Sequence, residues 1–261
     1  MSDSTMTEAN TAICKCQRCK DIKYVFFDEI VAEYGYHEWA QPCPVCNAQN
    51  IANDQRARAG IPRKYFCTFY PDFKWDSYGK NVAEQKMLVT DFVKSFQKWK
   101  DNRMGLYIWS KERGSGKTML ASAVLNSLML QNGVSARFTS VPNYLGILTN
   151  AFKRKSEETD HSAQYWQSDV LCFDDLGAEK QTEWSNQELF KIIDYRYLKG
   201  KSLVVTSNMQ IKDLECDDRI VDRLNDMCMQ IHMPEESIRT MIANNKKNKF
   251  AESIREKYGG R

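Results

Sequence analysis

The sequence has no apolar stretch near the roughly 18 residues that a bilayer-spanning helix requires. Its first residues, MSDSTMTEAN, lack the basic and apolar regions of a secretory signal peptide. Internal repeats, collagen-like repeats and low-complexity tracts are also absent. A formal net charge of only +3 does not by itself identify a nucleic-acid-binding protein. We therefore expect a cytoplasmic protein with no membrane partner.

The composition is that of a globular chain, with 42% hydrophobic and 27% charged residues among 261. That length predicts one large α/β domain, or a medium domain with a small appendage. The charge is uneven, because residues 239–261 carry seven basic side chains against two acidic ones. Any polyanion should therefore meet this C-terminal part first.

Cysteine is concentrated near the N-terminus, with five of nine residues before position 50. Cytosolic thiols stay reduced, so clustered cysteines indicate metal ligands. Two CxxC pairs fit the tetrahedral Cys₄ site of a zinc ribbon: Cys16/Cys19 and Cys43/Cys46. Cys14 could replace Cys16, and His37 is a weaker substitute. We expect a structural Zn²⁺ in a domain over 1–52 that the metal helps to fold.

A linker is predicted at 53–62, where Gly60 and Pro62 break regular structure. Strand-like and helix-like runs then alternate, which predicts an α/β domain over 63–261: a parallel sheet with helices on both faces. The predicted strands are 106–109, 136–141, 170–173, 203–206 and 228–233, and the predicted helices include 118–130 and 186–198.

A phosphate-binding loop follows the first of these strands. Gly114, Ser115, Gly116, Lys117 and Thr118 match the P-loop pattern, in which backbone N–H groups surround phosphates at a helix N-terminus. Lys117 would contact the β- and γ-phosphates of ATP, and the Thr118 hydroxyl would bind Mg²⁺. Lys111 departs from the pattern, because it stands at the first glycine position.

Further polar residues complete the predicted ATPase site. Asp174 and Asp175 follow an apolar strand, so Asp174 would hold Mg²⁺ and Asp175 would orient or deprotonate the attacking water. Asn208 follows the next strand and could bond the γ-phosphate or the water. Arg219 and Arg223 share one helical face, which suits either a solvated, salt-bridged face or an arginine finger for an adjacent subunit.

The order and the amino-acid sequences of these segments resemble those of the AAA+ helicase loaders of the DnaC/DnaI type and of the related IstB-like ATP-binding family. The resemblance rests on GIPRKYFCTF (60–69), the GSGKT loop, LCFDDLGAEKQTEW (171–184), LFKIIDYRY (189–197), VVTSNMQIKDL (204–214), DRIVDRLNDMC (218–228) and PEESIR (234–239). It implies that Asp174 and Asp175 are the Walker B acids, Asn208 is sensor 1, and Arg223 is the arginine finger with Arg219 as its neighbour. Little chain follows residue 240, so a full helical lid with its own sensor arginine is not expected.

The resemblance implies an ATPase that loads a hexameric, DnaB-like replicative helicase onto single-stranded DNA when replication initiates. Hydrolysis is expected to be slow and stimulated by a partner or by DNA. Self-association would occur through the ATP sites, and the zinc domain would hold the helicase. Lys153, Arg154 and Lys155 are candidate DNA contacts, although a solvated helix face also explains them. Two alternatives remain, an IstB-like transposition ATPase and an adaptor that binds ATP without hydrolysing it.

Overall fold

The computed structural model of the protein describes residues 24–31, 35–42, 52–153, 162–240, 247–248, 250–252 and 254–255. The chain divides into two compact units, Met1–Gln55 and Arg56–Arg261. The predicted zinc ligands Cys16, Cys19, Cys43 and Cys46, the spare Cys14, and the candidate DNA contacts Arg154 and Lys155 all lie outside the described residues.

The smaller unit contains an antiparallel hairpin of two strands, β1 (Tyr24–Val31) and β2 (Gly35–Pro42). Tyr24 pairs with Pro42 at its open end, and Val31 pairs with Gly35 beside the turn. His37 lies within β2, opposite Glu29.

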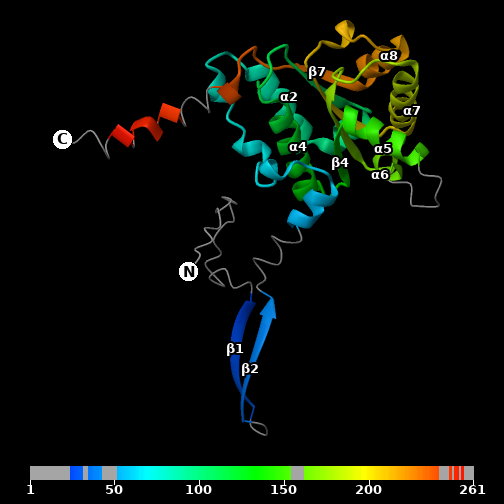
Figure 1. The fold of residues 1–261 in the computed structure, drawn as a ribbon. Helices are drawn as coiled ribbons and strands as arrows, with labels where there is room; N and C mark the ends of the chain where they lie inside the picture. Colours follow the sequence, from blue (N-terminus) through cyan, green and yellow to red (C-terminus); the bar gives the residue numbers. More distant parts are fainter. Residues whose placement is uncertain are drawn as a thin grey trace, which may run out of the picture. The chain divides into compact units, whose positions relative to one another are not determined.

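The larger unit is built on a sheet of five strands in the order β4-β5-β6-β3-β7. Figure 1 labels its two edge strands, β4 and β7. The strands are β3 (Gly105–Trp109), β4 (Ala136–Ser140), β5 (Val170–Leu176), β6 (Ser202–Ser207) and β7 (Cys228–His232). Every neighbouring pair is parallel, so the carboxyl ends of all five strands lie at one edge. The predicted α/β class with a parallel sheet is confirmed, and β5 extends beyond its predicted end to include both acidic residues.

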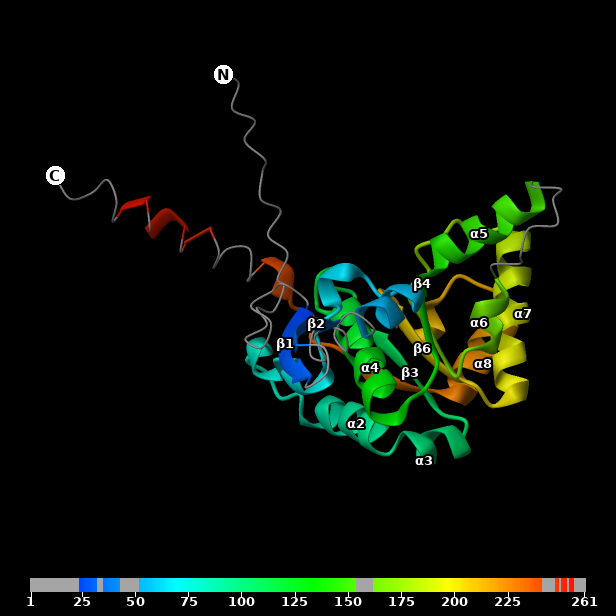
Figure 2. The same ribbon diagram turned by 90° about the horizontal axis from the view of Figure 1, so that it is seen from below.

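Helices cover both faces of this sheet (Figure 2). One face carries α2 (Ala83–Lys94), α3 (Phe96–Asp101) and α4 (Lys117–Asn132); the other carries α5 (Val141–Lys153), α6 (Ala163–Gln167), α7 (Glu183–Lys199) and α8 (Asp218–Met227). Short 3₁₀ helices are η1 (Arg63–Tyr65), η2 (Tyr70–Asp72), η3 (Trp75–Tyr78) and η4 (Ile211–Asp213). No helix in the described ranges is long and apolar enough to cross a membrane.

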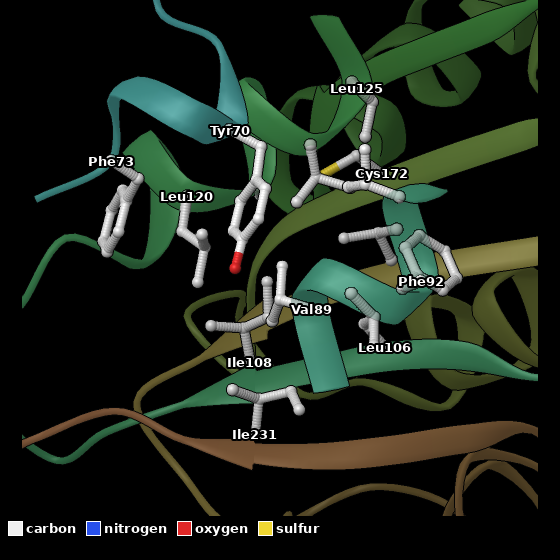
Figure 3. Close-up of a cluster of buried hydrophobic side chains, with 14 of the residues drawn as sticks. Tyr70, Phe73, Val89, Phe92, Leu106, Ile108, Leu120, Leu125, Cys172 and Ile231 are labelled. Carbon is white, nitrogen blue, oxygen red and sulfur yellow. The ribbon is translucent and has the colours of Figure 1, made fainter. Parts of the chain in front are cut away.

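Strand alternation divides the buried side chains into two cores. Leu106 and Ile108 of β3 pack with α2 and α4, and Figure 3 shows them in one cluster with Val89 and Leu120. Tyr107 of the same strand points to the opposite core, with α5, α7 and α8. A central strand that is buried on both faces is uniformly apolar, which is why its sequence predicted a parallel sheet.

The segment predicted as a linker, 53–62, takes a more ordered form. Residues 52–58 are helical, and Ala59 and Ile61 are buried in the core beside α4. The Ala59 carbonyl accepts the N–H of Phe138 in the edge strand β4, with an N···O distance of 2.6 Å. Residues 59–61 therefore form part of the larger unit's packing.

Arg196 anchors α7 to the rest of the larger unit. Its side chain is 0% exposed, and its guanidinium donates to the carbonyls of Tyr165, Ser168, Asp169 and Ser202 at 2.6 to 3.2 Å. Burial lowers the pKa of Arg196 to about 9. The charge is thus balanced by backbone dipoles, which ties α7 to the segment before β5 and to the start of β6.

Candidate nucleotide-binding site

The loop between β3 and α4 has the backbone conformation of a phosphate-binding loop. Gly114 and Gly116 have φ values of +87° and +95°, which L side chains rarely adopt. A Cβ on Gly116 would also lie 3.0 Å from the hydroxyl of buried Tyr78, which donates to the Ser115 carbonyl at 2.6 Å. Glycine at both positions therefore lets the loop curl in front of the α4 N-terminus.

Lys117, at the start of α4, is 6% exposed and is held by backbone oxygens. Its Nζ donates to the carbonyls of Ser110 and Glu112 at 3.0 and 2.9 Å, and to Ser115 Oγ at 3.3 Å. Burial lowers the pKa of the ammonium, and the nearby Asp175 carboxylate opposes this. Phosphate oxygens would be stronger acceptors than these neutral carbonyls, so the ammonium is ready to exchange partners.

Asp174 joins the loop to the sheet. Its Oδ2 accepts the Thr118 hydroxyl at 3.2 Å, and its Oδ1 accepts the Thr206 hydroxyl of β6 at 2.6 Å. Burial raises the pKa of Asp174, whereas the hydrogen bond from Thr206 lowers it. A hydroxyl and a buried carboxylate side by side form the oxygen donor set that Mg²⁺ prefers, so these residues fit the predicted ion.

Asp175 adopts an unusual backbone conformation for a non-glycine residue, with φ of +58°. Asp tolerates this left-handed region better than most residues. Its N–H donates to Thr206 Oγ1 at 3.0 Å, so one threonine hydroxyl contacts both acidic residues. Asp175 also lines the pocket in front of the loop.

Most of the predicted nucleotide residues line one pocket of about 640 Å³, and Asp174 lies behind it, bonded to Thr118. Its lining includes the whole run from Gly114 to Thr118, together with Asp175 and Asn208. Asn208 follows β6 directly, at the same carboxyl edge of the sheet as Asp175. Residues from three separate stretches of the sequence therefore surround one space large enough for a small ligand.

Several lining residues were not predicted, among them Lys64, Tyr65, Ile238 and Arg239. Although no further sensor arginine was expected, Arg239 reaches the pocket from the C-terminal side and donates its N–H to the Gly114 carbonyl at 3.2 Å. These four residues belong to the GIPRKY and PEESIR stretches, which were noted only as parts of a resemblance. Membership of these two stretches was the sequence signal that could have identified the four residues as pocket residues.

Arg219 and Arg223 of α8 do not line this pocket. Arg219 pairs with Asp217 at 2.8 Å, and its guanidinium lies 4.2 Å from the ring centre of Phe190. Arg223 pairs with Asp194 at 2.9 Å and covers the ring of Tyr197. Within one chain, the two arginines form the salt-bridged surface that was one of the two predicted alternatives.

Comparison with known proteins identifies a family for most of this unit. A model described as "IstB-like ATP binding protein" matches residues 79–247. The uncharacterized protein YqaM of Bacillus subtilis is 25% identical over 196 residues, which cover 73% of this chain and 61% of YqaM. The chain thus matches less than two thirds of that relative's length.

Two further similarities are to proteins named DnaC. The replicative helicase loader DnaC of Buchnera aphidicola subsp. Acyrthosiphon pisum is 24% identical over 199 residues, which cover 71% of this chain and 78% of that protein. A crystal structure of the DnaC helicase loader has a TM-score of 0.59 at 23% identity, covering 66% of this chain and 100% of that one. At this identity the structure supports the fold alone, and the predicted AAA+ P-loop fold is confirmed.

Proposed function

The chain belongs to the IstB-like ATP-binding protein family, and on that premise we propose that it is an ATPase that loads a replicative DNA helicase onto single-stranded DNA at replication initiation. The observation that carries the ATPase part is the convergence of the P-loop, Asp175 and Asn208 on one pocket. The loader part is supported by the names of relatives such as the replicative helicase loader DnaC.

In the proposed reaction, the N–H groups of 113–118 and the α4 N-terminus receive the phosphates of ATP. Lys117 leaves its backbone carbonyls and pairs with the β- and γ-phosphates. Thr118 and Asp174 would hold Mg²⁺, which neutralises charge on the phosphates when bound. Asp175 orients or deprotonates the attacking water, and Asn208 bonds the γ-phosphate or that water.

Substitutions separate binding from turnover at this site. Lys117→Ala should abolish ATP binding, because the buried ammonium that pairs with phosphate is lost. Asp175→Asn should keep binding and lose turnover, since Asn also tolerates left-handed backbone but does not accept a proton. Undiminished phosphate release from Asp175→Asn would contradict the role given to that carboxylate. A wild-type chain that binds ATP without releasing phosphate, with or without single-stranded DNA, would support the adaptor alternative.

Arg223 is proposed to act on the ATP of an adjacent subunit, with Arg219 beside it. Its guanidinium is partly exposed and lies away from the pocket of its own chain, which is compatible with action between subunits. We expect a mixture of Arg223→Ala and Lys117→Ala chains to recover part of the turnover that each lacks alone. A complete lack of recovery would leave the salt-bridged surface as the role of Arg223.

The helicase partner can be tested against the transposition alternative. We expect the full chain with ATP to capture a hexameric replicative helicase rather than a transposase, and single-stranded DNA to increase phosphate release. Capture of the transposase alone would favour the IstB-like alternative. The zinc site and its role in holding the helicase stay predictions, and they require one zinc per chain that Cys43→Ser removes together with helicase capture.

A further inference from the structure

The start of the P-loop is bonded to a carboxylate from a distant part of the sequence. The N–H of Lys111 donates to Oε1 of Glu235 at 3.0 Å, and the N–H of Glu112 donates to Oε2 at 2.7 Å. The Ser110 hydroxyl donates to the same Oε2 at 3.2 Å. Glu235 therefore gathers the donors at the point where the chain leaves β3.

Lys111 takes an ordinary backbone conformation at the position where the P-loop pattern has a glycine. Among the described non-glycine residues, only Arg103 and Asp175 have positive φ, so Lys111 does not need glycine's conformational freedom. The backbone of 110–112 is instead held by hydrogen bonds to a charged acceptor, which are stronger than bonds between neutral groups. The shape of the loop start is thus fixed from outside the loop.

One peptide group connects Glu235 to Lys117. The carbonyl of Ser110 and the N–H of Lys111 belong to the same planar unit. Its N–H donates to the Glu235 carboxylate, and its carbonyl accepts the Lys117 ammonium at 3.0 Å. The two opposite charges polarise this peptide in the same direction, so each bond strengthens the other. Glu235 thereby helps to fix where Lys117 rests.

Glu235 is itself held in place by its own segment. Its Oε1 lies 2.9 Å from His232 Nε2, and the His232 ring stacks on Trp109 with ring centres 4.0 Å apart. Farther along, Arg239 donates its N–H to the Gly114 carbonyl. Residues 232–239 therefore contact the loop both at its start and at Gly114.

We propose that Glu235 is a positioning residue for phosphate binding, whose carboxylate holds the 110–112 backbone in the shape that receives a triphosphate. This proposal rests on the proposed ATP-binding function. Glu235 does not line the pocket and makes no hydrogen bond to Asp174 or Asp175. Its loss should therefore weaken nucleotide affinity and leave the turnover of bound ATP largely intact.

The test compares Glu235→Ala and Glu235→Gln with Glu236→Gln in the full chain. Glu236 is a matched control, because it is the adjacent carboxylate and pairs with Lys80 at 2.8 Å rather than with the loop. By calorimetric titration with Mg·ATP, we expect Glu235→Ala to raise Kd about tenfold. Glu235→Gln should have a smaller effect, because its amide oxygen can accept one N–H. In both variants kcat should change less than KM.

Hydrogen exchange of the nucleotide-free chain gives a readout that a general loss of stability would not reproduce. Amides of 110–114 should exchange faster in Glu235→Gln, with the rest of the larger unit unchanged. An unchanged Kd in Glu235→Ala, or faster exchange spread over the whole unit, would overturn this proposal while ATP binding by the wild-type chain stands. If the wild-type chain itself binds no ATP, the proposed function fails and this proposal fails with it.

Discussion

Replacing Thr206 with valine tests how the two acidic residues of β5 are held. Thr206 is fully buried in β6, and valine has nearly its shape without the hydroxyl. The variant loses the donor to Asp174 Oδ1 and the acceptor for the N–H of Asp175. Both acids should therefore lose part of their positioning at once.

The expected loss of stability follows from these two hydrogen bonds. A bond to a carboxylate contributes about 1.5–3 kcal/mol and a neutral one about 1 kcal/mol, and burial of the added methyl offsets part of the loss. We expect the free energy of unfolding to fall by about 2 kcal/mol. Because the Thr206 hydrogen bond lowers the pKa of Asp174, its loss should raise that pKa further. Turnover near neutral pH should fall about tenfold, which corresponds to an increase of ~1.4 kcal/mol in the activation free energy.

The assay is the pH dependence of ATP hydrolysis, together with urea unfolding. In Thr206→Val the acidic limb of kcat/KM should move to higher pH, since the proposed role of Asp174 in holding Mg²⁺ requires the ionised carboxylate. Thr206→Ser should restore wild-type behaviour because it keeps the hydroxyl. Thr139→Val is the matched control: the hydroxyl of this buried β4 threonine also makes two hydrogen bonds, to the Ser140 carbonyl and from Asn143, and neither bond is to an acidic residue. If both valine variants show the same pH profile, the reasoning about Thr206 is wrong.

Three other predictions follow from the described contacts. Asp174→Asn should raise the Tm of the nucleotide-free chain, measured by calorimetry near neutral pH. Burial raises the pKa of Asp174 in the folded chain, so the stability of the wild-type chain falls as pH rises from the ordinary Asp pKa through the folded-state pKa, and the variant should lack this fall. An unchanged Tm would contradict this prediction. Arg196→Met should lower the unfolding free energy in urea by about 3–5 kcal/mol, because buried carbonyls lose their donor; a loss below ~1 kcal/mol would argue against that anchor. Tyr78→Phe should raise the Kd for ATP about fivefold by releasing the Ser115 carbonyl, and an equal Kd would exclude this support of the loop.

The sheet could be predicted because its strands are locally distinctive. Apolar runs such as 106–109 and 203–206 are buried on both faces of the sheet. A helix lies close to each of these strands in the sequence. The P-loop residues and Asp174 were equally readable, since glycine, lysine and a carboxylate at a strand end have few other reasons to occur together. Local pattern was sufficient for both.

Other features depend on tertiary contacts that no local pattern encodes. Glu235 lies 123 or more positions along the sequence from the two backbone N–H groups that donate hydrogen bonds to it, and nothing in PEESIR distinguishes it from Glu236. The reversed backbone at Asp175 was also unreadable, because aspartate is common in ordinary conformations. Residues 59–61 read as a linker because Gly60 and Pro62 suggest a break, whereas the adjacent Ala59 and Ile61 are buried.

The left-handed backbone at Asp175 limits which acids this position accepts. Aspartate and asparagine enter that region at modest cost, whereas a longer glutamate gains no comparable help from its side chain. An engineer who lengthened this carboxylate to extend its reach would therefore strain the peptide and weaken the grip of Thr206 on its N–H. The choice of acid here is dictated by main-chain shape as much as by proton chemistry.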